Sequence, residues 1–262
     1  MKEITLVTGA TGGVGVAFSR ELASRGERLL LTGRSIEKLT RLRDDLLAMY
    51  PTEIWTIAAD LSDGAEREKI ANFLQENDLR VGRLINVAGV DIQKGIETYT
   101  QEKIAFQCRT NFEAAVSLCK VAIDYRSDAL EILNVSSVSG IYPMPYFAIY
   151  SATKSALTSF SIALREEMKG KGVKVTAVLP GAMPTREDIR EQIKGQGLWG
   201  KIATKSPAWV AKKSLNALSK NKRTYIPGLA NKLMHFFTKL IPLSWKLAFI
   251  AKRWGKISKD AF

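Results

Sequence analysis

The sequence predicts a doubly wound α/β fold around a parallel sheet, and three features of the chain support this prediction. Short apolar runs alternate with segments of helical periodicity, which is typical of strands joined by right-handed helical crossovers. The runs are apolar throughout, as expected for strands that helices cover on both faces. A glycine-rich turn at residues 8–15 directly follows the first run. Because open parallel sheets bind ligands at the carboxyl ends of their strands, this turn is a candidate binding site.

The expected elements follow one another without a break. We expect strands at residues 3–8, 27–32, 53–59, 83–88, 129–137, 173–179 and 223–227. Helices are expected between them at residues 13–25, 35–49, 63–77, 101–126, 149–169 and 207–219. The third run leads to Asp60, the fourth to Gly89 and the sixth to Pro180 and Gly181. Because no linker or repeat interrupts residues 1–190, we expect one domain at 1–228, followed by a tail at 229–262.

The composition excludes several protein classes. The 262 residues are 46% hydrophobic and 25% charged, unlike a disordered, collagen-like or disulfide-stapled chain. Cys108 and Cys119 fall in one predicted helix, three turns apart, so we interpret both as buried thiols in a reducing compartment. His235 is the only histidine, and no metal site is expected. The start of the chain has too short an apolar run for a signal peptide, and no spanning segment is evident, so we expect a cytoplasmic protein.

The positive charge is concentrated at the end of the chain. Lys, Arg, Asp and Glu balance over residues 1–190, whereas residues 191–262 carry the whole net charge of +13. Such asymmetry favours a polyanionic surface as partner. Membrane headgroups fit better than nucleic acid, because no nucleic-acid recognition motif accompanies the charge.

The glycine-rich turn has the properties of a phosphate-binding loop. Glycine permits positive φ and leaves no side chain between backbone and ligand, and the next helix offers free N–H groups to a pyrophosphate. The pattern departs from G-x-G-x-x-G, since Phe18 stands at the third glycine. Arg34 follows the second strand, where an arginine binds the 2′-phosphate of NADP and an acid would bind the ribose of NAD. The alternative for the turn is a glycine-rich turn that binds no ligand. The alternative for Arg34 is a solvated surface arginine.

Three side chains suit proton transfer to a carbonyl. Tyr150 and Lys154 share one face of a helix, and Ser137 ends the fifth strand. A nearby ammonium favours the phenolate and lowers a tyrosine pKa from its usual value of about 10. A serine hydroxyl orients a substrate oxygen while a cofactor carries hydride. The spacing alone is weak, because most such pairs are helix-surface pairs.

Together these motifs resemble the short-chain dehydrogenase/reductase family, in its single-domain branch, over residues 3–190. The turn is similar to the family's T-G-x-x-x-G-x-G, residues 86–89 to its N-A-A-G, and residues 180–185 to its P-G-x-x-x-T. The resemblance implies that the cofactor contacts are Gly9, Thr11, Gly13, Val14, Gly15, Arg34, Asp60, Leu61, Asn86, Ala88, Gly89, Tyr150, Lys154, Pro180, Gly181 and Thr185.

The same resemblance implies a fold and a mechanism. The expected sheet is Rossmann-like, with seven parallel strands in the order 3-2-1-4-5-6-7. Tyr150 would be the general acid or base, Lys154 would bind the nicotinamide ribose and lower the tyrosine pKa, and Ser137 would fix the substrate oxygen. Asn111 would hold a backbone kink and a water in a proton relay. We expect NADP(H) as cofactor, NADPH preferred over NADH, and a dimer or tetramer formed through helices 101–126 and 149–169. The alternative is a regulator or scaffold without enzymatic activity. Relatives of that kind typically lose the tyrosine or lysine, whereas both are present here.

Two further segments are candidate substrate walls. Residues 182–206 match the family's substrate lid, in which Leu198, Trp199 and Ile202 would line an apolar pocket. A second wall would come from Tyr142, Met144, Tyr146 and Phe147. Ordinary core packing is the alternative for both.

The tail reads as a basic amphipathic helix. Lys232, Lys239, Lys246 and Arg253 recur every seven residues, His235 and Lys256 lie near the same side, and apolar residues fill most of the rest. Pro242 should bend or divide the helix. We expect peripheral contact with an anionic membrane. The alternatives are a substrate cap on the same subunit and packing on a second one. A membrane position would favour a lipophilic carbonyl or alcohol: fatty acyl, sphingoid, sterol-like or polyprenyl.

Overall fold

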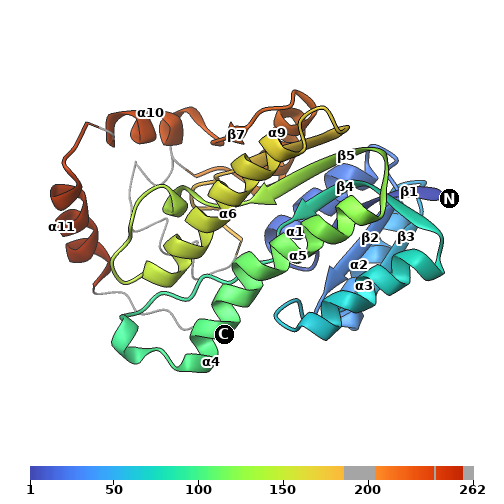
Figure 1. The fold of residues 1–262 in the computed structure, drawn as a ribbon, viewed down its shortest axis with the longest axis horizontal. Helices are drawn as coiled ribbons and strands as arrows, with labels where there is room; N and C mark the ends of the chain where they lie inside the picture. The colour runs from blue at the N-terminus through green and yellow to red at the C-terminus, as the bar shows by residue number, and fades with distance from the viewer. Residues whose placement is uncertain (186–203, 239, 256–262) are drawn as a thin grey trace.

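The computed structural model describes residues 1–185, 204–238 and 240–255. Within these residues, one parallel sheet has seven strands in the order β3-β2-β1-β4-β5-β6-β7 (Figure 1). The strands are β1 (Lys2–Val7), β2 (Leu29–Gly33), β3 (Ile54–Ala58), β4 (Leu79–Asn86), β5 (Arg126–Val135), β6 (Val173–Val178) and β7 (Thr224–Tyr225). The predicted strand order is confirmed, and it places the glycine-rich turn where the direction of winding reverses between β1 and β4.

Helices cover both faces of the sheet and form two cores. One face packs against α1 (Gly13–Ala23), α2 (Ile36–Met49) and α9 (Pro207–Ser219). The other packs against α3 (Gly64–Glu76), α5 (Ala114–Asp124) and α6 (Ala148–Glu167). Alternate strand residues point to opposite faces, so both cores consist of strand and helix side chains, and continuous apolar runs result.

Phe18 shows why the glycine pattern of the turn departs from the common form. Its side chain has no exposed surface and packs in the core under α1, together with Val7, Leu22 and Leu31. The third position of the common pattern therefore has a packing role in this chain. Only the glycines that face the turn itself have to be small.

The predicted helix at residues 101–126 is divided into three parts. It consists of α4 (Gln101–Cys108), a π-helical turn (Arg109–Glu113) and α5. The expectation that both cysteines are buried is wrong for Cys108, which ends α4 and is exposed, and right for Cys119. Burial raises the pKa of the Cys119 thiol to about 12, so this thiol is inert.

A cluster of charged side chains crosses the sheet and was not predicted. Arg83 on β4 lies opposite Glu131 on β5, which lies opposite Lys174 on β6. Arg83 Nη2 is 2.7 Å from a Glu131 carboxylate oxygen, Lys174 Nζ is 3.1 Å from the other, and Arg83 also pairs with Glu27. β4 begins at Leu79, four residues before the predicted run at 83–88.

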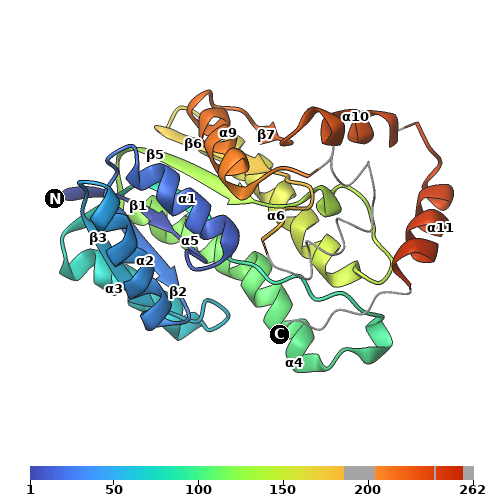
Figure 2. The same cartoon turned by 180° about the vertical axis from the view of Figure 1, so that it is seen from behind.

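The tail forms two helices at the end of the molecule that lies opposite the N-terminus (Figures 1 and 2). These are α10 (Leu229–Thr238) and α11 (Leu243–Trp254), and Pro242 immediately precedes α11, so the predicted division is confirmed. The structure does not show the expected basic side as one continuous face, although Lys232 and Arg253 are exposed. Exposed side chains include Leu229, Leu233, Phe236, Phe237, Leu240, Ile241, Leu243, Trp245 and Phe249, whereas Lys246 is half-buried. No described helix combines the length and hydropathy that a membrane span requires.

Candidate active site

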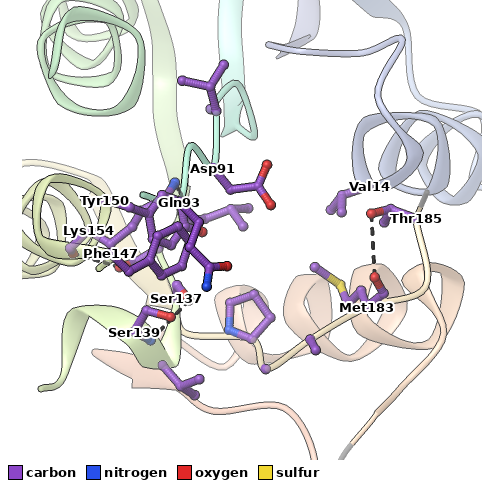
Figure 3. Close-up of a pocket in the computed structure, with 18 of the residues that line it drawn as sticks. Val14, Asp91, Gln93, Ser137, Ser139, Phe147, Tyr150, Lys154, Met183 and Thr185 are labelled. Atoms are coloured by element: carbon purple, nitrogen blue, oxygen red, sulfur yellow. Dashed lines mark hydrogen bonds between the residues drawn. The ribbon is translucent and has the colours of Figure 1, made fainter. Parts of the chain in front are cut away.

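A cavity of about 1440 Å³ opens at the carboxyl ends of the strands. The glycine-rich turn, the loops after β2 to β6, the start of α6 and the two tail helices all contribute to its lining. Figure 3 shows side chains entering it from several elements: Val14 and Thr185 on one side, Ser137, Tyr150 and Lys154 on the other. This volume exceeds that of a typical pocket for one small ligand, so a dinucleotide and a second molecule fit together.

The turn at residues 8–15 has no room for side chains. Gly9 has φ +60°, and a Cβ atom there would lie 2.8 Å from the Ala88 backbone. A Cβ on Gly15 would overlap the Gly9 carbonyl oxygen, and one on Gly13 would lie 3.0 Å from Thr185. Because the backbone forms the surface and α1 begins at Gly13, free N–H groups face the cavity, and the residues present fit a dinucleotide pyrophosphate.

Lys154 lies buried one helical turn after Tyr150. Its side chain is 4% exposed, and Nζ donates a hydrogen bond to the Val135 carbonyl oxygen at 2.9 Å. Nζ is 5.8 Å from the Tyr150 ring centroid, and that ring stacks on Phe147 at a centroid distance of 4.3 Å. Burial lowers the pKa of Lys154 to about 8, although the Asp91 carboxylate acts in the opposite direction. A lysine with this pKa is still mostly charged at neutral pH.

Ser137 is positioned by the loop that leaves β5. Its hydroxyl accepts a hydrogen bond from the Ser139 backbone N–H at 3.1 Å, which fixes the side chain at the cavity wall. The preceding Ser136 hydroxyl donates to the Lys154 carbonyl oxygen at 2.7 Å. This bond ties α6 to β5, so the serine and the tyrosine are held by connected elements.

Asn111 occupies the π-helical turn, in agreement with the expected backbone kink. Its Oδ1 accepts from the Val90 N–H at 2.7 Å, and its Nδ2 donates to the Val90 carbonyl oxygen at 2.9 Å and to Thr153 at 3.2 Å. A Cβ on Gly89 would lie 3.2 Å from both Asn111 Oδ1 and Lys154 Nζ. Asn111 therefore does not line the cavity, but its side chain holds the loop after β4 close to the lysine.

Asn86 also lies behind the cavity rather than in it. Its Nδ2 donates to Asn134 Oδ1 at 2.9 Å and to the Ala115 carbonyl oxygen at 3.2 Å, and the residue is 3% exposed. The expected direct cofactor contact by this side chain is thus not what the geometry offers. Asn86 instead holds the end of β4 against β5 and α5, and Val87, Ala88 and Gly89 form the wall.

The remaining expected cofactor residues line the cavity. Arg34 does so beside Phe106, whose ring centroid is 6.0 Å from the guanidinium carbon. Asp60 and Leu61 line it as well, and the Asp60 carboxylate accepts hydrogen bonds from the backbone and hydroxyl of Ser62. The other members of this group are Thr11, Val14, Pro180, Gly181 and Thr185.

The predicted substrate walls are partly present. Tyr142, Met144 and Phe147 line the cavity, whereas Tyr146 has φ +62° and lines a smaller neighbouring pocket. Tyr146 therefore does not contribute to the wall of the larger cavity. Of the predicted lid, residues 182, 183, 185 and 204 line the cavity, and Leu198, Trp199 and Ile202 lie outside the described residues.

The tail is joined through Tyr142 to the segment between β5 and α6. The Tyr142 hydroxyl is 2.8 Å from His235 Nδ1 and also bonds to the Thr238 hydroxyl, both on α10. From α11, Lys246 Nζ lies 5.1 Å from the centroid of the Tyr142 ring and donates to the Thr238 carbonyl oxygen at 3.1 Å. The two tail helices thus form one wall of the cavity on their own subunit.

Sequence reasoning missed several lining residues. Lys38 follows Arg34 by one helical turn, and Asp91 and Gln93 lie in the irregular loop after β4. Lys38 could have been found, since a second basic residue near Arg34 strengthens a phosphate site. No periodicity exists in the loop at 89–93, so nothing in the sequence indicated which of its side chains face inward.

Known proteins of similar sequence and fold belong to one family of dehydrogenases and reductases. A family model described as short chain dehydrogenase matches residues 3–194. The very-long-chain 3-oxoacyl-CoA reductase of Bos taurus is 34% identical over 197 residues, which cover 70% of this chain and 60% of that protein. A solved short-chain dehydrogenase from Sphingobium yanoikuyae in complex with NADPH has a TM-score of 0.77 and 26% identity, covering 100% of this chain and 98% of its own. A 7beta-hydroxysteroid dehydrogenase structure has a TM-score of 0.84 and 25% identity, covering 95% and 96%.

Proposed function

The chain belongs to the short chain dehydrogenase family, and we propose that it interconverts a carbonyl and an alcohol with NADP(H) as cofactor. The bound cofactor supplies the hydride. The observation that carries the proposal is the meeting of Ser137, Tyr150 and Lys154 in the cavity whose far side is the glycine-rich turn (Figure 3). The family match and a structural relative in complex with NADPH support it.

In this proposal Tyr150 exchanges the proton. During reduction its hydroxyl donates a proton to the substrate carbonyl oxygen, and during oxidation its phenolate takes the proton back. The Lys154 ammonium favours the phenolate and so lowers the cost of this exchange. Ser137 donates a hydrogen bond to the same substrate oxygen and fixes its distance from Tyr150. Asn111 would support a proton relay to Lys154, since it holds the loop after β4 at a point where Asn111 Oδ1 and Lys154 Nζ both approach Gly89.

The preference for NADPH over NADH is assigned to Arg34. Its guanidinium gives charge-assisted hydrogen bonds to a 2′-phosphate, and Lys38 adds a second positive charge on the same cavity wall. We expect Arg34→Ala to lower kcat/KM for NADPH by about 10-fold to 100-fold, with little change for NADH. An unchanged ratio of the two cofactors would refute this assignment.

We propose that the substrate is a lipophilic 3-oxoacyl compound or the corresponding 3-hydroxyacyl compound. The named activity of the Bos taurus relative supports this class, although the chain spans only 60% of that protein. The cavity supports it independently, because its substrate end is lined by apolar side chains: Met144, Phe147, Met183, Met234, Ile241 and Ile250. A fatty chain would lie along these residues with its oxo group at Tyr150.

Turnover tests the proposal. NADPH oxidation would be followed with 3-oxoacyl thioesters and simple ketones of rising chain length. We expect Tyr150→Phe to reduce turnover by at least about 100-fold, because the proton donor is lost. If the variant keeps most of its rate, the tyrosine assignment is wrong. If the unmodified protein binds NADPH but turns over no carbonyl compound, a regulatory or scaffold role is favoured instead.

We also propose that the tail contacts an anionic membrane surface. Its exposed apolar side chains would enter the headgroup region, and the positive charge of residues 191–262 would favour anionic lipid. Flotation with anionic vesicles tests this: the double variant Phe236→Ser and Phe237→Ser should lose binding. The matched control Ile96→Ser removes an equally exposed apolar side chain elsewhere and should not. Full-length protein that ignores anionic vesicles would end this proposal.

A homo-oligomer, dimer or tetramer, is proposed through the α4–α5 and α6 surfaces. On α6, the small residues Ala152, Ser155 and Ser159 are exposed along one side, which permits close approach of a second helix. Light scattering would give the mass, and Ser159→Arg should shift it toward the monomer. An unchanged mass would show that another surface forms the contact.

A further inference from the structure

The side chain of Gln93 has an unusual environment. It is 4% exposed, it lines the cavity, and among the described residues its Nε2 has no hydrogen-bond partner. Figure 3 shows its carboxamide directed into the cavity from the side that also carries Ser137, Phe147 and Tyr150. Buried amide groups are nearly always hydrogen-bonded, so an unpaired one at a cavity wall indicates a group that a ligand satisfies.

The rest of the loop does not share this property. Asn111 binds both the N–H and the carbonyl oxygen of Val90, and the Tyr99 hydroxyl donates to the Ile92 carbonyl oxygen at 3.0 Å. The neighbouring Gln107, also fully buried, donates to the Val90 carbonyl oxygen at 3.4 Å. The loop is thus held in place by its own contacts. The Gln93 amide is presented on a fixed backbone and takes no part in holding it.

We propose that Gln93 recognises a second oxygen atom of the substrate, one that is not reduced. This inference rests on the proposed function and deepens it: the reacting 3-oxo group lies at Ser137 and Tyr150, and the acyl carbonyl oxygen accepts a hydrogen bond from Gln93 Nε2. The two carbonyl groups of a 3-oxoacyl compound are separated by one carbon atom. They therefore need two donors on the same side of the cavity, and Figure 3 shows Ser137 and Gln93 on that side.

The charge of the loop narrows the substrate class further. Asp91, two residues before Gln93, also points into the cavity (Figure 3). A free 3-oxo acid would bring its carboxylate toward this acidic side chain, which like-charge repulsion disfavours. An acyl thioester or ester has a neutral carbonyl at the same position.

The test compares two substrates in Gln93→Met, which keeps the length of the side chain and removes the donor. One substrate is a 3-oxoacyl thioester, and the other is a simple ketone of equal chain length without the acyl carbonyl. We expect the ratio of their kcat/KM values, thioester over ketone, to fall by about 10-fold to 100-fold, mainly through KM for the thioester. The matched control Gln101→Met, at an exposed position of α4 outside the cavity, should leave the ratio unchanged.

A stability measurement separates recognition from a structural role. Because Nε2 has no partner among the described residues, Gln93→Met should be at least as resistant to urea as the unmodified protein. An unchanged ratio would overturn the assignment, as would a loss of stability with equal losses on both substrates. If the unmodified protein reduces the ketone and the thioester equally well, Gln93 has no role in selection. Absence of turnover on either substrate would instead refute the proposed function.

Discussion

Replacing Lys154 with methionine should make the cofactor-free protein more stable while removing its activity. The lysine is buried, and its pKa falls from 10.5 to about 8 on folding, mainly because burial disfavours the charged amine. A difference of this size corresponds to a penalty of roughly 3 kcal/mol at neutral pH. Methionine keeps the length of the side chain without the charge. It also loses the hydrogen bond to the Val135 carbonyl oxygen, which costs about 1 kcal/mol.

The expected net gain is therefore about 2 kcal/mol in the free energy of unfolding at pH 7. Its pH dependence identifies the cause. Between pH 8 and 10.5 the unfolded chain holds a proton on Lys154 that the folded chain has lost, so the stability of the unmodified protein rises with pH relative to Lys154→Met. The gain should disappear by about pH 10, where the buried amine is already neutral.

Urea denaturation of both proteins at pH 7 and pH 10 measures this difference. Groups that do not contact Lys154 titrate alike in the two proteins and cancel, and Tyr150→Phe in both backgrounds removes the phenol beside Lys154. Lys213→Met, at an exposed position of α9, is the matched control and should show no pH-dependent gain. If Lys154→Met is less stable than the unmodified protein at pH 7, or if its gain is the same at both pH values, the reasoning from burial is wrong.

Three further substitutions test the structure. Gly15→Ala should abolish NADPH binding in a fluorescence titration and lower the melting temperature, because its Cβ would overlap a carbonyl oxygen, whereas Gly64→Ala, with ordinary space at the start of α3, should do neither. Tyr142→Phe should weaken the attachment of the tail by about 1–3 kcal/mol and speed its proteolysis, whereas Tyr146→Phe, outside that network, should not. Burial raises the pKa of Glu131, but its basic partners outweigh this and hold it below the usual value. The stability that Glu131 contributes is therefore present at neutral pH and lost in acid, so Glu131→Gln should cost about 1–3 kcal/mol at pH 7 and less as the pH falls below about 4 in urea denaturation.

The alternation of strands and helices and the positions of Ser137, Tyr150 and Lys154 at the cavity were predictable from local pattern, whereas the strand order was implied by the family resemblance. An apolar run before a glycine-rich turn identifies β1, and the positions of Ser137, Tyr150 and Lys154 follow from the ends of regular elements. Arg34 was found in the same way, at the end of β2. Residues at the ends of parallel strands meet at one edge of the sheet, so their order along the chain already implies that they lie near one another.

The tail shows where pattern analysis fails. The heptad recurrence of basic residues predicted that they lie along one side of the tail, although Pro242 was expected to bend or divide the helix. The break before Pro242 gives α10 and α11 independent orientations, so Lys246 turns toward Tyr142 while Trp245 is exposed. A periodicity that crosses a helix break does not describe a single face. The contacts of the tail with the cavity depend on how α10 and α11 pack in the folded protein. The periodicity of the sequence therefore does not predict them.

Several residues at the cavity adopt arrangements that the stability of the fold alone would not favour. Lys154 is a buried amine, Gly9 adopts a left-handed backbone against Ala88, and Gln93 leaves a buried amide unpaired. The buried amine and the unpaired amide each cost stability, and both lie at the same cavity as Gly9. Buried polar atoms without a partner also occur away from the cavity, at Ser19, Thr32 and Ser214, but only groups that face the cavity can be compensated by a ligand. Different parts of the bound molecules would do so: phosphates at the glycines, a ribose at the lysine and an acyl oxygen at the glutamine.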